Sequence, residues 1–96
     1  MENTGTTDEE LMSAASDGDM DAFEELVRRH QTAAVNFANR MLSDPHAGAD
    51  AAQEAFLRII EKADGYRPTA RFRTYLFSIL RRICIDHYRK KRADLS

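Results

Sequence analysis

Apolar residues recur at spacings of three and four along most of this chain, and that period constrains the fold more than any other feature. An α-helix turns once every ~3.6 residues, so residues at these spacings lie along one helix face. The clearest stripe comprises Phe23, Leu26, Val27, His30, Ala34, Phe37, Ala38 and Met41. No segment shows sustained alternation of apolar and polar residues, the pattern that a half-buried strand requires. The sequence therefore predicts an all-α fold.

The first two predicted helices are bounded by capping residues and glycine. Asp8 is suited to cap a short helix, which Gly18 ends. Asp19 or Asp21 then caps the longer helix that carries the first apolar stripe. Residues 1–7 are polar and show no periodicity, so we expect a disordered N-terminus before the short helix.

A third helix is predicted after Asp44, which is suited to cap it, and Pro45, which is suited to its first turn. Gly48 is expected to interrupt that turn before the regular helix begins. The buried face is predicted to consist of Ala52, Ala55, Phe56, Ile59, Ile60 and Ala63. The opposite face is predicted to carry Asp50, Gln53, Glu54, Leu57, Arg58 and Glu61.

A turn-rich connector at residues 64–68 leads to the last predicted helix, residues 70–91. Glycine permits positive φ in the connector, and proline disfavours a helical residue before it. The buried stripe of the last helix comprises Phe72, Leu76, Ile79, Leu80, Ile83 and His87. We expect residues 8–92 to form one compact bundle of three main helices plus a short N-terminal helix, with residues 93–96 starting an interdomain linker.

The length and composition exclude several classes of protein. With 96 residues the chain makes about one small domain, too small for a deep enclosed active site. Apolar residues make up 43% and charged residues 31%, which is typical of a folded globular chain. There is no apolar run of the roughly 20 residues that a membrane span needs, and the acidic N-terminus is unlike a signal peptide. We expect a cytoplasmic protein that does not insert into a membrane.

The residue types that perform catalysis or bind metal are scattered. His30, His46 and His87 are far apart in sequence, and no glycine-rich phosphate loop or nucleophile motif is present. His30 and His87 lie on apolar stripes and are expected in the core, whereas His46 is expected to be exposed. Cys84 is the only cysteine, which excludes an intrachain disulfide and suggests a packing role. We expect no enzymatic activity, metal or cofactor.

Charge is divided unevenly along the chain. Residues 1–65 carry five Lys and Arg against fourteen Asp and Glu, whereas residues 66–96 carry nine against two. Such asymmetry suggests two different partners, one of them a polyanion, although a solvated charged face would look the same.

The last predicted helix interleaves cationic and aromatic residues. Its cations are Arg71, Arg73, Arg81, Arg82, Arg89, Lys90, Lys91 and Arg92, and its aromatic candidates are Tyr75, Phe77 and Tyr88. Cations hold phosphates and aromatic rings stack on unpaired bases, at about 1–3 kcal/mol per base. The alternative is that Tyr75 and Phe77 simply pack in the core. These residues alone predict nucleic-acid binding and no more.

Three motifs in register resemble a known family. They are DAAQEAFLR at residues 50–58, FRTYLFSI at residues 72–79 and IDHYR at residues 85–89. In this order and spacing they resemble the bacterial sigma factors of the extracytoplasmic-function type, over residues 9–92. Each motif alone is weak, but the three together are specific.

The resemblance implies two partners and assigns residues to each. Core RNA polymerase would be bound, at the clamp helices of its largest subunit, by Asp50, Gln53, Glu54, Leu57 and Arg58, with Leu57 as the apolar anchor. The connector resembles the loop in which such proteins hold a flipped base of the nontemplate minus-ten element, and Tyr66 and Arg67 would line that pocket. The expected DNA contacts are therefore Tyr66, Arg67, Arg71, Arg73, Tyr75, Arg81, Arg82, Tyr88, Arg89, Lys90, Lys91 and Arg92.

The resemblance also implies a second DNA-binding domain beyond a linker, so we expect the natural protein to be longer than this chain. It further implies a sequestering anti-sigma factor. Three positions depart from the usual family pattern. Ala49 stands where many relatives are acidic, Tyr75 where they have tryptophan, and Arg82 where they have asparagine. Arg82 is expected to contact phosphate instead of a base.

Two other functions fit the same residues. One is a basic helical module that binds duplex DNA, which would show no preference for single strands. The other is a protein-interaction bundle without DNA activity, in which neutralising residues 89–92 would leave function intact.

Overall fold

The computed structural model describes residues 5–67 and 69–95. It contains the helices α1 (Asp8–Ser16), α2 (Met20–Leu42), α3 (Pro45–Glu61) and α4 (Phe72–Leu95), and a short 3-10 helix, η1 (Ala63–Gly65). Within these residues there is no strand, and three long helices follow one short one. The predicted all-α bundle is therefore confirmed.

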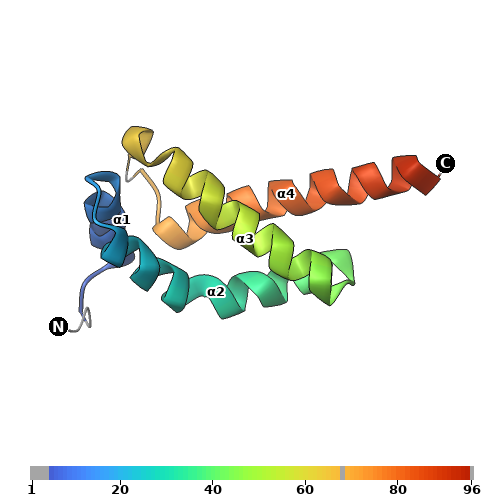
Figure 1. The fold of residues 1–96 in the computed structure, drawn as a ribbon, viewed down its shortest axis with the longest axis horizontal. Coiled ribbons are helices and arrows are strands. Elements are labelled where there is room, and N and C mark those ends of the chain that lie inside the picture. Colours follow the sequence, from blue (N-terminus) through green and yellow to red (C-terminus); the bar gives the residue numbers. More distant parts are fainter. Residues whose placement is uncertain (1–4, 68, 96) are drawn as a thin grey trace.

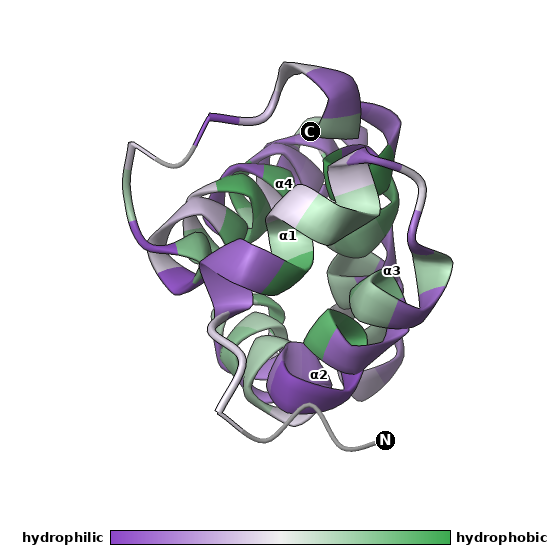
Figure 2. Cartoon of the chain, turned by 90° about the vertical axis from the view of Figure 1, so that its left-hand side faces the viewer, coloured by the Kyte–Doolittle hydropathy of each residue, from purple (hydrophilic) through white to green (hydrophobic). Residues whose placement is uncertain are grey.

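The helices cross to give an elongated bundle measuring 50 × 24 × 20 Å (Figure 1). At one end of it α1 and η1 lie beside the start of α4, and at the other end the chain turns from α2 into α3. The last turns of α4 extend past the rest of the bundle. Hydrophobic stretches alternate with hydrophilic ones along each helix in Figure 2, as expected for helices that bury one face.

The start of α1 differs from the prediction. Its N-cap is Thr7, whose Oγ1 accepts from the backbone N–H of Glu10 at 3.0 Å while Glu10 Oε1 accepts from the N–H of Thr7 at 2.8 Å. This reciprocal pair is a capping box, which leaves Asp8 inside the helix with its carboxylate turned toward α2. The assignment of Asp8 as the cap was thus wrong. Residues 1–4 of the N-terminus expected to be disordered lie outside the described residues.

The other boundaries follow the predicted chemistry. Gly18 has φ of +103°, the left-handed backbone that ends α1, and Asp19 caps α2 by accepting from Ala22 N–H at 3.1 Å. Asp44 caps α3 by accepting from the N–H groups of His46 and Ala47 at 3.0 and 3.3 Å. Pro45 occupies the first turn of α3, as predicted.

Two predicted boundaries require correction. Gly48 does not interrupt α3, which is continuous from Pro45; it is buried against Asn39 of α2 instead. α4 begins at Phe72 and runs to Leu95, whereas the sequence predicted residues 70–91. Residues 93–95 are therefore helical, and Ser96 lies outside the described residues.

The hydrophobic core is built from all four α-helices. Its fully buried large side chains are Phe72, Met12, Leu26, Ile59, Leu76, Leu80 and Cys84. The predicted burial of Cys84 and His30 is confirmed, and the His30 ring lies 5.5 Å from that of Phe72. His87 was predicted on the buried stripe but is exposed, because burial along α4 ends at Ile83 and Cys84. Across the described residues no helix has the length and apolarity needed to span a membrane.

Candidate protein and nucleic-acid interfaces

The outward face of α3 presents the five residues assigned to polymerase binding. Leu57 is 52% exposed, so a large apolar side chain lies at the surface of α3. Around it the polar residues are Asp50, Gln53, Glu54 and Arg58. Arg58 Nη2 pairs with Glu54 Oε2 at 2.6 Å, one helical turn apart. The structure confirms that this face of α3 is directed outward, and its role in polymerase binding stays a prediction.

A hollow between α2 and α3 continues this face and includes residues that sequence reasoning missed. From α3 it takes Gln53, Leu57 and also Ala49, which departs from the family pattern. From α2 it takes Phe23, Val27, Gln31 and Val35. Val27 and Val35 are half-buried and eight residues apart, so they mark one edge of the α2 stripe. An apolar hollow beside an exposed leucine is suited to receive side chains of a partner helix.

The cationic residues of α4 are all exposed, together with Arg71 just before the helix. Arg82 Nε lies 3.6 Å from Asp86 Oδ1, and the Arg92 guanidinium lies 5.9 Å from the centre of the Tyr88 ring. Tyr88 is itself 52% exposed. The C-terminal half of α4 thus offers a cationic surface with an exposed aromatic ring, as predicted.

The other aromatic residues of α4 are partly packed. Phe77 is half-buried, with its ring edge-to-face against Phe37 at 5.2 Å and the Arg73 guanidinium 4.7 Å from its centre. Tyr75 is half-buried and packs against Tyr66 and Phe72, at 5.6 and 6.5 Å between ring centres. Each ring therefore contributes to packing while keeping part of its surface exposed.

The hollow beside Phe77 adds α2 residues to the cationic surface. It is lined by Asn36 and Arg40 of α2 and by Arg73, Thr74 and Phe77 of α4, along with Ala33 and Phe37. No carboxylate occurs among these lining residues. Arg40 is one turn after Asn36 on the exposed side of α2, so only the packing of α2 on α4 brings it near Arg73.

The connector places Tyr66 inward. Its ring lies on Tyr75, and its hydroxyl group is buried without a hydrogen-bond partner among the described residues. Burial raises the pKa of the Tyr66 phenol, and Glu9, Tyr75 and Asp8 raise it further. Arg67 is exposed, and its Nη1 donates to the Tyr66 carbonyl oxygen at 3.3 Å. The next residue, Pro68, lies outside the described residues.

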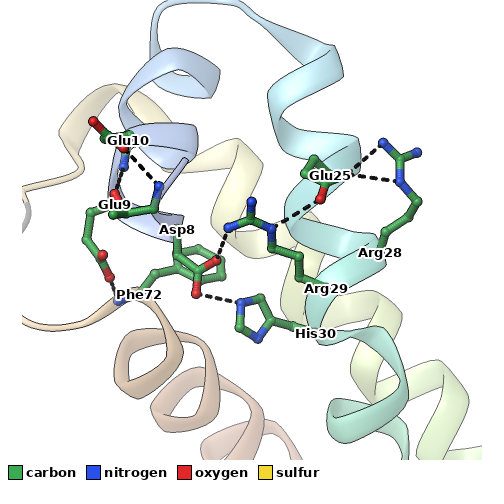
Figure 3. A network of polar contacts seen from close by, with 9 residues as sticks. Asp8, Glu9, Glu10, Glu25, Arg28, Arg29, His30 and Phe72 are labelled. Atoms are coloured by element: carbon green, nitrogen blue, oxygen red, sulfur yellow. Dashed lines mark hydrogen bonds and ion pairs between the residues drawn. The ribbon is translucent and has the colours of Figure 1, made fainter. Parts of the chain in front are cut away.

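A polar network joins α1 to both α2 and α4, and sequence reasoning missed it (Figure 3). Asp8 Oδ2 lies 2.8 Å from His30 Nε2, and Asp8 Oδ1 lies 3.1 Å from Arg29 Nη1. The hydrogen bond from Arg29 to Asp8 raises the pKa of the Arg29 guanidinium. The neighbouring Glu9 accepts from the backbone N–H of Phe72 at 2.6 Å.

Glu25 extends the network along α2. It accepts from Arg28 Nη2 at 2.9 Å and from Arg29 Nε at 3.1 Å, and these two bonds lower the pKa of the Glu25 carboxyl group. In the parts of the chain that the structure describes, no group of three or more metal-ligating side chains occurs.

Comparison with known proteins identifies the class to which this arrangement belongs. The family model described as Sigma-70 region 2 matches residues 26–93, which is most of the chain. The chain therefore belongs to the Sigma-70 region 2 family, and the resemblance drawn from the three motifs is confirmed. The match begins at Leu26, in the second turn of α2, so α1 lies outside it.

Two relatives specify the type of sigma factor that the chain resembles. It is 36% identical over 77 residues to the ECF RNA polymerase sigma factor SigW of Bacillus subtilis (strain 168), covering 80% of this chain and 41% of that protein. It is 33% identical over 81 residues to the RNA polymerase sigma factor CarQ of Myxococcus xanthus, covering 84% of this chain and 47% of that protein. The chain thus spans less than half the length of either relative.

Proposed function

We propose that this domain docks on core RNA polymerase through the outward face of α3 and holds the nontemplate strand of promoter minus-ten DNA with the connector and α4. The observation that carries the proposal is the presence of two different surfaces on one domain of this family. One surrounds the exposed Leu57, and the other combines exposed cations with aromatic rings. These are the surfaces that a coiled coil and a single-stranded nucleic acid would each require.

The polymerase contact is assigned to Leu57 as anchor, with a polar rim. The rim comprises Asp50, Gln53, Glu54 and Arg58, and the α2 side of the hollow supplies Val27 and Val35. Because Ala49 lines the same hollow, the loss of an acidic side chain there leaves the contact more apolar than in many relatives.

The DNA contact is divided between phosphate and base. The phosphate contacts are assigned to Arg71, Arg73, Arg81, Arg82, Arg89, Lys90, Lys91 and Arg92, and the base contacts to Tyr66, Arg67, Tyr75 and Tyr88. Arg82, already near Asp86, would supply affinity for phosphate without base discrimination.

Melting on this account requires no catalysis. Flipping a base out of the duplex costs a few kcal/mol. A surface that binds only the open strand offsets this cost with the free energy of binding. The domain therefore acts by differential affinity for open over closed DNA, in the cytoplasm where polymerase and promoter meet. A sequestering anti-sigma factor would act by covering the same two surfaces.

The test compares single-stranded and duplex DNA in the presence and absence of core polymerase. Fluorescent pools of randomised short strands, single or annealed, are mixed with the chain, and retention is measured by anisotropy and electrophoresis. We expect retention of the single strand to require core polymerase and to exceed that of the duplex. Equal or stronger duplex binding without polymerase would instead support a duplex-binding module. Polymerase binding that brings no DNA retention would leave a protein-interaction bundle.

A further inference from the structure

The first turn of α4 is held by a residue from the other end of the chain. Glu9 Oε2 accepts the backbone N–H of Phe72, the first residue of α4, at 2.6 Å across 63 positions of sequence. N–H groups in the first turn of a helix have no partner within the helix, and a carboxylate there also faces the positive end of the helix dipole. Glu9 thus performs for α4 the task that a local capping residue performs for α2 and α3 (Figure 3).

The Glu9 side chain can do this because α1 is itself fixed to α2. The adjacent Asp8 places one carboxylate oxygen 2.8 Å from His30 Nε2 and the other 3.1 Å from Arg29 Nη1. Behind these polar contacts Leu11, Met12 and Ala15 are buried in the core. α1 is therefore a rigid support and not a loosely attached N-terminal segment.

The Glu9 contact fixes the C-terminal end of the connector. η1 ends at Gly65, and the connector residues 66–67 and 69–71 lead directly to Phe72. Tyr66 packs on Tyr75 at 5.6 Å between ring centres, and Tyr75 packs in turn on Phe72 at 6.5 Å. The relative position of Tyr66 and Tyr75 therefore depends on where Phe72 is held.

We propose that Glu9 is a positioning residue for promoter opening, which sets the distance and orientation between the connector and the first turn of α4 so that the packed pair of Tyr66 and Tyr75 can hold one base beside it. This role rests on the proposed function. It assigns a part in DNA binding to α1, a helix that lies outside the residues matched by the family model.

The experiment uses the chain bound to core polymerase, and a single-stranded oligonucleotide that the native complex selects from a randomised pool. Three variants are compared with the native chain. Glu9→Ala removes the acceptor, Glu9→Gln keeps an oxygen acceptor without the charge, and Glu24→Ala removes an exposed carboxylate on α2 as the matched control. Affinity for polymerase and affinity for the oligonucleotide are measured separately.

We expect Glu9→Ala to weaken oligonucleotide binding by about tenfold while polymerase affinity stays within about twofold, in line with the loss of one helix cap. Glu9→Gln should recover most of the loss, and Glu24→Ala should show none. Weaker binding by Glu9→Ala would separate a positioning role from simple electrostatics, because removing a negative charge near DNA would by itself strengthen binding. Amide hydrogen exchange in the free chain should also speed up at residues 66–73 in Glu9→Ala alone.

Three results would overturn the role of Glu9. The first is native oligonucleotide affinity in Glu9→Ala, even where amide exchange has accelerated. The second is an equal loss of polymerase affinity, which would mean that the whole domain is disturbed. The third is failure of the native complex to select any single strand, which would overturn the proposed function itself and is distinguished because it appears before any substitution.

Discussion

Gly48 of α3 lies so close to Asn39 of α2 that a Cβ atom on Gly48 would stand 2.9 Å from the Asn39 backbone nitrogen. A side chain could turn away from such a contact, but the backbone in the middle of a helix cannot. Gly48 therefore allows α2 and α3 to cross at close range. That crossing shapes the hollow in which α2 residues join Leu57.

Gly48→Ala is therefore expected to lower the free energy of unfolding by about 1–3 kcal/mol, because the added methyl group forces the two helices apart. Urea denaturation followed by circular dichroism measures it. Gly65→Ala is the matched control, since nothing lies within 4 Å of a Cβ atom there. Equal stability of the two variants would contradict the close crossing.

Asp8→Ala is expected to lower the free energy of unfolding by about 1–3 kcal/mol, because it leaves the buried His30 ring and Arg29 without their shared acceptor. His30 is only 6% exposed, so water cannot fully replace the lost carboxylate. Asp21→Ala, which removes an exposed carboxylate from the first turn of α2, serves as the control. A change below about 0.5 kcal/mol in Asp8→Ala would show that the contact adds nothing to stability.

The Asp44 cap predicts a pH dependence. The N–H groups of Ala47 and His46 lower the pKa of the Asp44 carboxyl group below its ordinary value of 3.8 in the folded chain. A group whose pKa is lowered by folding contributes stability above its unfolded pKa and loses it as pH falls through the folded pKa. The stability difference between the native chain and Asp44→Ala should thus be constant near neutral pH and shrink below 3.8. A difference that grows on acidification would contradict this assignment.

Cys84 is expected to be unreactive in the folded chain. It is fully buried, and burial raises the pKa of its thiol above 9.0. A reagent therefore cannot reach the sulfur atom, and little of the thiol is in the reactive thiolate form. Alkylation by iodoacetamide at mildly alkaline pH should be about a hundredfold slower in the native chain than in urea. Rapid native alkylation would mean that the junction of α4 with α2 opens readily.

Local patterns in the sequence predicted the helices and their faces well. Spacings of three and four placed Leu57 outside and Ile59 inside, because both positions follow from helical geometry alone. Asp19 and Asp44 could also be predicted as helix caps, because the backbone N–H groups that they accept from lie within three residues of them.

Contacts between distant residues could not be predicted in this way. Asp8 and His30 are 22 positions apart, and Glu9 and Phe72 are 63 apart, so no local spacing marks either pair. Asp8 was mistaken for a cap because aspartate before a helical pattern has that role more often than it supports a buried histidine. His87 was placed in the core because the three-and-four periodicity of α4 continues past Cys84, the last residue of this helix that is buried.

The central claim is that the α3 face binds polymerase, and binding to the isolated clamp-helix segment of the largest subunit tests it most directly. The native chain is compared with a Gln53→Ala, Leu57→Ala double variant and with Leu95→Ala, which removes an exposed leucine from the far end of α4. We predict that the native chain and Leu95→Ala bind alike, and that the double variant, still helical by circular dichroism, loses at least about tenfold in affinity. Undiminished binding by the double variant, or no binding by the native chain at high micromolar concentration, would contradict the account.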